Sequence, residues 1–184
     1  MALIILAHPK FEKSLANKTI LKELQKSDLA LEIRNIHRLY PDYKIDVKAE
    51  QEALLRHQTI VFQYPFYWLN IPAILKLWFD EVFSNQFAYG SKGDKLKGKD
   101  FVPSVTVGGS EEAYKITGKH HVRIYEFSKN IEQTAYYAQM NYIDPIYFYG
   151  TSTAVGGYTE NDIKDRAKHH AKRLTKQLTE LRDR

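Results

Sequence analysis

The sequence predicts one α/β domain, in which a doubly wound sheet of five parallel strands carries helices on both faces. Short apolar runs of strand length alternate with amphipathic stretches of helical spacing along the chain, and this alternation is typical of βαβ units. The 184 residues are 43% apolar and 27% charged, which is ordinary for a globular domain. The sequence contains no repeat, low-complexity stretch or linker, so we expect residues 1–184 to form a single domain.

The first half of the chain provides three of the expected strands. Residues 2–7 are continuously apolar, as expected for a parallel strand that is buried on both faces. Ser14 stands where it can cap a helix, and residues 29–36 alternate apolar with polar side chains, which indicates a more exposed strand. The expected segments are strand 2–7, helix 14–26, strand 29–36, turn 40–42, helix 47–57 and strand 59–63.

The second half provides the other two strands. Pro72 opens a helix at a position where its missing N–H costs no hydrogen bond. The expected segments are helix 73–83, loop 87–99, strand 101–107, helix 122–140, strand 145–149 and helix 159–184. Five strands with right-handed crossovers favour the flavodoxin-like order 2-1-3-4-5, in which ligands bind beyond the carboxyl ends of the strands. The loops after the first, third and fourth strands are therefore the expected site.

The composition excludes several other classes of function. No cysteine is present, which excludes disulfides and thiolate chemistry. The net charge of +5 comes from scattered basic residues, of which the densest group, 166–176, lies on the last expected helix; we expect no nucleic-acid partner. His169 and His170 have no Asp, Glu or Cys at ligand spacing, so no metal site is expected. The initial apolar run is too short for a signal peptide or a membrane span, and we expect a cytoplasmic protein.

The first of the three loops joins a buried strand to the start of a helix. Free N–H groups and the helix dipole favour an anion at such a place. The loop contains His8, Ser14, Leu15, Ala16 and Asn17, and three of these side chains can donate hydrogen bonds. No glycine-rich nucleotide motif is present. An ordinary turn capped by Ser14 is the alternative interpretation.

The second loop gathers Phe66, Tyr67, Trp68 and Leu69 between two prolines, directly after a buried strand. Exposed rings lower solubility unless something flat covers them, and a planar heterocycle would do so. The alternative is that these rings close the core or form a dimer contact. The third loop, Thr106, Val107, Gly108 and Gly109, ends the fourth strand. Its paired glycines allow a backbone to approach a ligand closely, although a bare turn is the favoured interpretation of this loop taken alone.

Taken together, the three loops resemble the flavin-binding segments of the NAD(P)H:quinone oxidoreductase family with a flavodoxin-like fold. The segments that carry the resemblance are 8–9, 14–17, 65–68, 72–80 and 106–109. Within this family the sequence is most similar to ancillary proteins of glutathione-gated potassium-efflux (Kef) systems and to general-stress oxidoreductases, through residues 39–42, 45–46, 49–54 and 87–90. The resemblance extends from residue 1 to about residue 150.

The resemblance implies a bound flavin, which we expect to be FMN because the chain lacks the C-terminal extension of the longer FAD members; FAD is the alternative. The phosphate and ribityl end would lie against His8, Ser14, Leu15, Ala16 and Asn17. The isoalloxazine ring would be lined by Phe66, Tyr67, Trp68 and Leu69, and its pyrimidine end would meet Thr106, Val107, Gly108 and Gly109. Val107 departs from the second Thr that is common in the family, so one side-chain contact is in doubt.

Tyr114 and His120 follow the glycine pair at offsets that match the acceptor-site Tyr and His of the mammalian-type members. The resemblance implies that both hydrogen-bond a quinone-like acceptor and stabilise its charge as it receives hydride. The implied reaction is a two-electron hydride transfer from NADPH or NADH through flavin N5 to the acceptor, with ping-pong kinetics. The alternative is a surface loop in which a Tyr and a His occur by chance.

The family also implies a homodimer with its sites at the subunit boundary, and Trp78, Phe79, Tyr136 and Tyr137 are candidates for that surface. A second candidate function is a regulatory ancillary subunit of a potassium-efflux antiporter, in which the flavin is mainly structural. That role would hold the protein at the inner face of the cell membrane. A one-electron carrier flavodoxin is a third candidate, but such proteins are usually strongly acidic, whereas this chain is basic.

Overall fold

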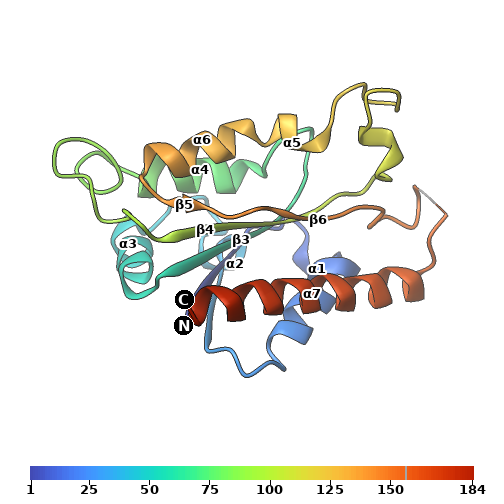
Figure 1. Ribbon diagram of the computed structural model, residues 1–184, viewed down its shortest axis with the longest axis horizontal. Coiled ribbons are helices and arrows are strands. Elements are labelled where there is room, and N and C mark those ends of the chain that lie inside the picture. Colours follow the sequence, from blue (N-terminus) through green and yellow to red (C-terminus); the bar gives the residue numbers. More distant parts are fainter. Residues whose placement is uncertain (156) are drawn as a thin grey trace.

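The computed structural model describes residues 1–155 and 157–184, and these form a parallel sheet between two layers of helices (Figure 1). The strands are β1 (Ala2–Leu6), β2 (Leu31–Asn35), β3 (Thr59–Pro65), β4 (Asp100–Thr106), β5 (Asn141–Tyr142) and β6 (Ile146–Phe148). Their order is β2-β1-β3-β4-β5, with β6 also paired to β4. All pairings are parallel, which confirms the predicted fold class and the strand order 2-1-3-4-5.

The fifth position of the sheet is occupied by two short strands, where the sequence predicts one. β5 pairs with the start of β4 and β6 with its end. Peptide groups of a parallel strand point alternately to its two neighbours. The carbonyl of Phe101 accepts from the N–H of Ile143, so Phe101 faces the fifth position of the sheet. Pro103, two residues further on, faces the same side and has no N–H to donate there. The break between β5 and β6, at Pro145, lies opposite this missing donor, as is usual for proline at a sheet edge.

The helices divide between the two faces of the sheet. Their bounds are α1 (Leu15–Leu24), α2 (Ile36–Leu39), α3 (Val47–Arg56), α4 (Ala73–Val82), α5 (Ile124–Phe127), α6 (Lys129–Tyr137) and α7 (Glu160–Arg182), with short 3₁₀ turns at Phe11–Lys13 and Glu112–Tyr114. One apolar cluster joins the sheet to α2, α3, α4 and α6. A second joins the opposite face to α1 and α7, which pack against each other (Figure 1).

Two elements differ from the prediction because side chains bond locally to the backbone. The expected helix 122–140 is divided into α5 and α6 at Ser128, whose hydroxyl lies 3.4 Å from the carbonyl of Ile124 and accepts from Tyr147 at 3.0 Å. The expected strand 29–36 ends one residue early, and the short α2 follows it. Asn35 caps α2 by accepting from the N–H of Arg38 at 3.2 Å.

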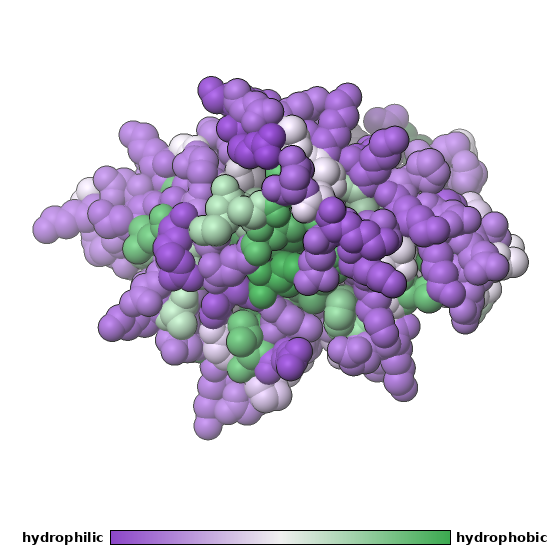
Figure 2. All heavy atoms as spheres, turned by 90° about the horizontal axis from the view of Figure 1, so that it is seen from below, coloured by the Kyte–Doolittle hydropathy of each residue, from purple (hydrophilic) through white to green (hydrophobic). Residues whose placement is uncertain are grey.

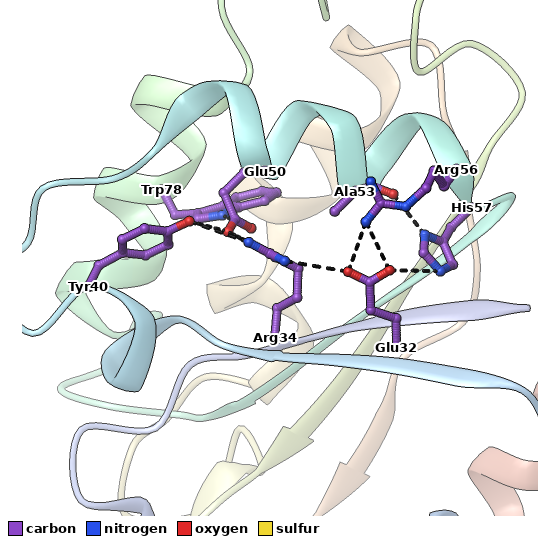
Figure 3. A network of polar contacts seen from close by, with 8 residues as sticks. All are labelled: Glu32, Arg34, Tyr40, Glu50, Ala53, Arg56, His57 and Trp78. Atoms are coloured by element: carbon purple, nitrogen blue, oxygen red, sulfur yellow. Dashed lines mark hydrogen bonds and ion pairs between the residues drawn. The ribbon is translucent and has the colours of Figure 1, made fainter.

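A buried carboxylate ties β2 to the helices beside it (Figure 3). Glu50 of α3 is fully buried, and it accepts hydrogen bonds from Tyr40 at 2.5 Å, Arg34 at 2.6 Å and Trp78 at 2.9 Å. A buried charge is tolerated when it is paired and hydrogen-bonded in this way. Glu32 of β2 belongs to the same network through Arg34, and it also contacts Arg56 and His57 (Figure 3).

The same network corrects one prediction about the molecular surface. Trp78 has an exposed fraction of 0% and Phe79 is also buried, so neither can form the proposed dimer surface. Both belong to the aromatic core around Phe62, whose ring centroid lies 5.8 Å from that of Trp78 and 5.0 Å from that of Phe79. Tyr136 and Tyr137, the other two candidates, are exposed on α6.

Candidate functional site

Three loops meet at the carboxyl ends of β1, β3 and β4, and Asn17 is their common point. Its amide nitrogen donates to Ser14 Oγ and to Thr106 Oγ1, both at 3.0 Å. The loop after β1 is thereby joined to the end of β4, 89 residues along the chain. The loop after β3 joins the same point, because the N–H of Phe66 donates to the carbonyl of Thr106 at 2.7 Å.

Gln63 is a member of this cluster that the sequence analysis did not identify. Its Nε2 donates to Asn17 Oδ1 at 2.7 Å, and its own Oε1 is buried without a hydrogen-bond partner among the described residues. The signal in the sequence is a long amide side chain in an otherwise apolar strand, residues 59–63. Buried polar groups are nearly always bonded, so a Gln at this place requires a polar neighbour.

The start of α1 presents hydrogen-bond donors. Ser14 caps the helix and accepts from the N–H of Asn17 at 3.2 Å, as expected. The N–H groups of Leu15 and Ala16 belong to the first turn, where the helix itself supplies no acceptor. These donors lie at the positive end of the helix dipole, so an anionic group is favoured there.

His8, earlier in the same loop, is an uncharged donor. Burial, reinforced by the nearby His37, lowers the pKa of His8 to about 4. Its Nδ1 accepts from the N–H of Lys10 at 3.0 Å, which leaves the proton of the neutral ring on Nε2. His8 can therefore donate a hydrogen bond at neutral pH without carrying a charge.

The aromatic loop after β3 is a tight two-residue turn. Tyr67 and Asn70 exchange backbone hydrogen bonds of 2.8 and 3.1 Å, and the two residues between them, Trp68 and Leu69, have φ values of 48° and 61°. Such turns normally contain Asn or Gly, because bulky residues are strained in the left-handed region. Trp68, at the first position of the turn, has 90% of its surface exposed. Strain of this kind is concentrated at functional sites.

The loop after β4 is held in place by backbone hydrogen bonds. Val107 is fully buried, and its N–H donates to Phe148 while its carbonyl accepts from Thr151. All its polar groups are thus used within the protein, and its role is to fix the loop. Gly109 accepts from the N–H of Gly150 at 2.7 Å, and a Cβ on Gly109 would lie 3.3 Å from the ring of Tyr114. The glycine therefore makes room for that ring.

Tyr114 and His120 form a stacked pair next to the aromatic loop. Their ring centroids are 4.5 Å apart with an interplanar angle of 23°, and Tyr114 also meets Phe66 edge-on at 5.8 Å. Burial raises the pKa of the Tyr114 hydroxyl, which keeps its proton available for donation. A cavity of about 430 Å³ opens beside Tyr114 and is lined also by Arg123 and Tyr149.

Two further observations concern the part of the chain that the structure describes. No three His, Asp or Glu side chains in it lie close enough together to hold a metal ion. None of its helices combines the length and apolarity that crossing a membrane requires.

Comparison with known proteins bears on the whole fold. A family described as having a flavodoxin-like fold, Flavodoxin_2, matches residues 1–175. The general stress protein 14 of Treponema denticola, solved in complex with FMN, is 32% identical, with a TM-score of 0.85 over 95% of this chain and 97% of that one. A structure described as a thermophilic tryptophan halogenase from Streptomycin violaceusniger is 33% identical, with a TM-score of 0.84 over 91% of this chain and 95% of that one. The fold is also that of an NADPH-quinone reductase from P. pentosaceus, at 23% identity and a TM-score of 0.75 over 93% and 97% of the two chains.

Proposed function

The chain belongs to the flavodoxin-like fold family, and from this premise we propose that its site binds FMN and reduces quinone-like acceptors with NADPH or NADH. The proposal rests on the hydrogen bonds that join Ser14, Asn17 and Thr106. These bonds bring the start of α1, the strained aromatic turn and the glycine pair to one edge of the sheet. The FMN bound to the Treponema denticola protein supports the choice of cofactor.

The donors at the start of α1 fit the phosphate and ribityl end of a flavin mononucleotide. Leu15 and Ala16 would bind it through their backbone N–H groups, with His8 and Ser14 adding side-chain donors. Asn17 acts on the phosphate indirectly, because both ends of its amide are engaged by protein groups and it therefore positions Ser14. The neutral, half-buried ring of His8 would contribute a hydrogen bond from Nε2 rather than a charge.

The aromatic turn and the glycine pair fit a planar ring. Trp68 and Leu69 would lie along one edge of the ring with Phe66 and Tyr67, and Gly108 and Gly109 would meet its pyrimidine end through their backbone. A bound flavin supplies the capacity to take up and release hydride. The protein would contribute the flat surface and the fixed N–H donors.

Tyr114 and His120 are proposed as the catalytic residues that touch the acceptor. A quinone oxygen gains negative charge as it is reduced, and a phenol and an imidazole can both donate hydrogen bonds to it. The two rings stack at 4.5 Å and lie in one loop. The N–H of His120 closes this loop by donating to the carbonyl of Ala113 at 2.9 Å. The pKa of Tyr114, raised by burial, keeps the phenol protonated through the neutral range.

Cofactor binding is tested with purified protein soaked in FMN or FAD, followed by release and identification of the bound flavin. We expect FMN to bind and to raise the melting temperature by about 5–10 °C at a hundredfold excess over its dissociation constant. Asn17→Ala should reduce both effects, whereas Asn161→Ala, an exposed residue of the first turn of α7, should change neither. Absence of bound flavin, with no thermal shift, would contradict the proposal.

Activity is tested by following NADPH and NADH oxidation with menadione as acceptor. Tyr114→Phe and His120→Gln should each lower kcat by about 10-fold to 100-fold, because each removes one donor to the developing charge. The matched controls are Tyr43→Phe and His121→Gln, which change exposed residues of the same types. Equal rates in all four variants would remove Tyr114 and His120 from the mechanism while leaving cofactor binding intact.

We also propose that the protein is a homodimer and that the α6 face forms its interface. Tyr137 is 71% exposed, its ring lies 5.4 Å from that of Tyr89, and a hollow of about 500 Å³ runs beside it between α4 and α6. Exposed aromatic residues beside an apolar hollow are typical of interfaces. Sedimentation should give a dimer for the native protein and a monomer for Tyr137→Glu; a native monomer would contradict this.

A further inference from the structure

A groove beside the edge strand β2 extends away from the candidate site, and we propose that it binds an extended, acidic segment of a partner protein, which joins the sheet beside β2. This groove has a volume of about 930 Å³ and runs between α1 and the edge strand β2. Of the proposed cofactor-binding residues it reaches Ser14 and Leu15, and it is also lined by Phe11, Glu12 and Lys13 of the same loop. The proposal rests on the edge of β2 and on this groove, and it does not require a bound flavin.

The first observation is the free edge of the sheet. β2 is the outermost strand, paired on one side with β1. The N–H of Ala2 donates to the carbonyl of Ala30, so in a parallel ladder the peptide groups of Leu31 and Ile33 point away from β1. Such a row of unpaired donors and acceptors is a template for an added strand.

The second observation is the apolar floor of the groove beside this edge. Leu6 and Leu21 are buried at its base, and Phe11, Leu15 and Ile33 are partly buried around them. Seen from the α1 and α7 side, apolar residues gather in the middle of a largely hydrophilic face (Figure 2). Alternate side chains of an added strand would enter this floor, since successive residues of a strand point to opposite faces.

The third observation is the charge around the groove. Lys13, Lys18, Lys22 and Arg38 line it and are exposed. Of the two acids in the lining, Glu32 is held by Arg56 at 3.1 Å, and Glu12 lies 3.8 Å from Lys18. The rim is therefore positive, and electrostatic complementarity favours an acidic occupant.

The same charges argue against a second copy of this chain as the occupant. Pairing of β2 with β2 around a two-fold axis would bring the cations of both rims together, and like charges in an interface are unfavourable. An acyl chain from a lipid would fill the floor but would leave the peptide groups of Leu31 and Ile33 without partners. An extended acidic peptide satisfies the edge, the floor and the rim together.

The test uses a fluorescein-labelled heptapeptide of alternating glutamate and valine, with binding followed by anisotropy. Two comparison peptides are needed: one with lysine in place of glutamate, and one methylated on the backbone nitrogens of alternate residues. We expect the lysine peptide to bind at least about tenfold more weakly, and the N-methylated peptide, in the register that blocks pairing, to lose about tenfold as well. Amide exchange of Leu31 and Ile33 should slow when the acidic peptide binds.

Protein variants then locate the binding surface. Lys22→Glu and Arg38→Glu should each weaken binding about fivefold to tenfold, and Thr19→Trp, which fills the groove, should abolish it. The matched control is Lys48→Glu, an exposed lysine on α3, which should change binding less than about twofold. The proposal is overturned if the acidic peptide does not bind, if N-methylation in either register has no effect, or if Lys22→Glu and Lys48→Glu behave alike. Binding to vesicles of anionic phospholipid with no peptide binding would also overturn it, in favour of a membrane surface.

Discussion

At the scale of single residues, polar side chains inside this protein are placed by a few specific contacts. His170 of α7 is buried, and its Nε2 lies 2.7 Å from Ser104 Oγ in β4. Burial, and then the charge of Arg173, lowers the pKa of His170 to about 3 from an ordinary value of 6.5. The folded protein therefore holds a neutral imidazole at a place where the unfolded chain would protonate it in mild acid.

This difference predicts how stability depends on pH. Because the folded pKa of His170 is lowered, its contribution is fully present above pH 6.5 and is lost as the pH falls from 6.5 toward 3. The free energy of unfolding should fall by about 3 kcal/mol on this account by pH 4. Urea unfolding between pH 4 and 8 measures it. His170→Gln should flatten the profile, whereas His169→Gln, exposed one residue earlier, should leave it unchanged; identical profiles for both variants would contradict the assignment.

At the scale of elements, two local structures depend on residues that are unusual in their positions. The Tyr67–Asn70 turn places Trp68 and Leu69 in the left-handed region, which Asn tolerates better than Leu. The β2, α2 and α3 elements meet around the buried carboxylate of Glu50. The turn stores strain close to the candidate site. The carboxylate of Glu50 determines how β2, α2 and α3 pack together.

Relief of the strained turn should stabilise the fold. Leu69→Asn is expected to raise the free energy of unfolding by about 0.5–1 kcal/mol, because Asn adopts a positive φ at lower cost. Leu39→Asn is a matched control, since both leucines are 46% exposed but Leu39 lies in α2 with a helical backbone; it should be neutral or destabilising. If the turn lies against the cofactor, Leu69→Asn should also weaken FMN binding. A destabilised Leu69→Asn protein would show that the turn is not strained.

Loss of the buried carboxylate should be costly. Glu50→Ala leaves Arg34 without its main partner and Tyr40 and Trp78 without an acceptor, so we expect a loss of about 3–5 kcal/mol in the free energy of unfolding. Glu52→Ala, an exposed acid on the same helix, should change it by less than about 0.5 kcal/mol. Chemical denaturation of the two variants provides the comparison, and a similar loss in both would mean that the network is not the cause.

At the scale of the whole molecule, the last helix of the chain packs against the first elements. α7 packs along α1 (Figure 1). The apolar cluster on this face contains residues of β1, α1, β3 and α7, so the first and last elements of the chain share one core. Elements that share a core unfold together.

A single cooperative transition is the expected consequence. Far-ultraviolet circular dichroism and tryptophan fluorescence should give coincident denaturant curves, because Trp78 is buried in the cluster on one face while α7, the longest helix, lies on the other. Truncation before α7 should abolish folding, since it exposes the apolar residues of β1 and α1. Two separate transitions in the full chain would show instead that the faces fold independently.

The sequence alone determined the alternation of strands and helices, the strand order and the loops in which the candidate site lies. These follow from local periodicity, from the cap at Ser14 and from the connection rules for parallel sheets. Residue types also indicated the site, since Ser14, Asn17, Thr106 and the aromatic turn were all expected there. Their binding roles stay predictions.

Only the tertiary structure decided which side chains meet. The bond from Asn17 to Thr106 joins residues 89 positions apart, and the roles of Gln63 and Glu50 depend on partners from other elements. Trp78 was expected at the surface and is buried, because an amphipathic pattern does not tell whether an aromatic residue of a helix faces its own core or a partner chain. The groove beside β2 likewise depends on where α1 lies over the sheet. Contacts between distant segments are set by packing, which leaves no periodic signal in the chain.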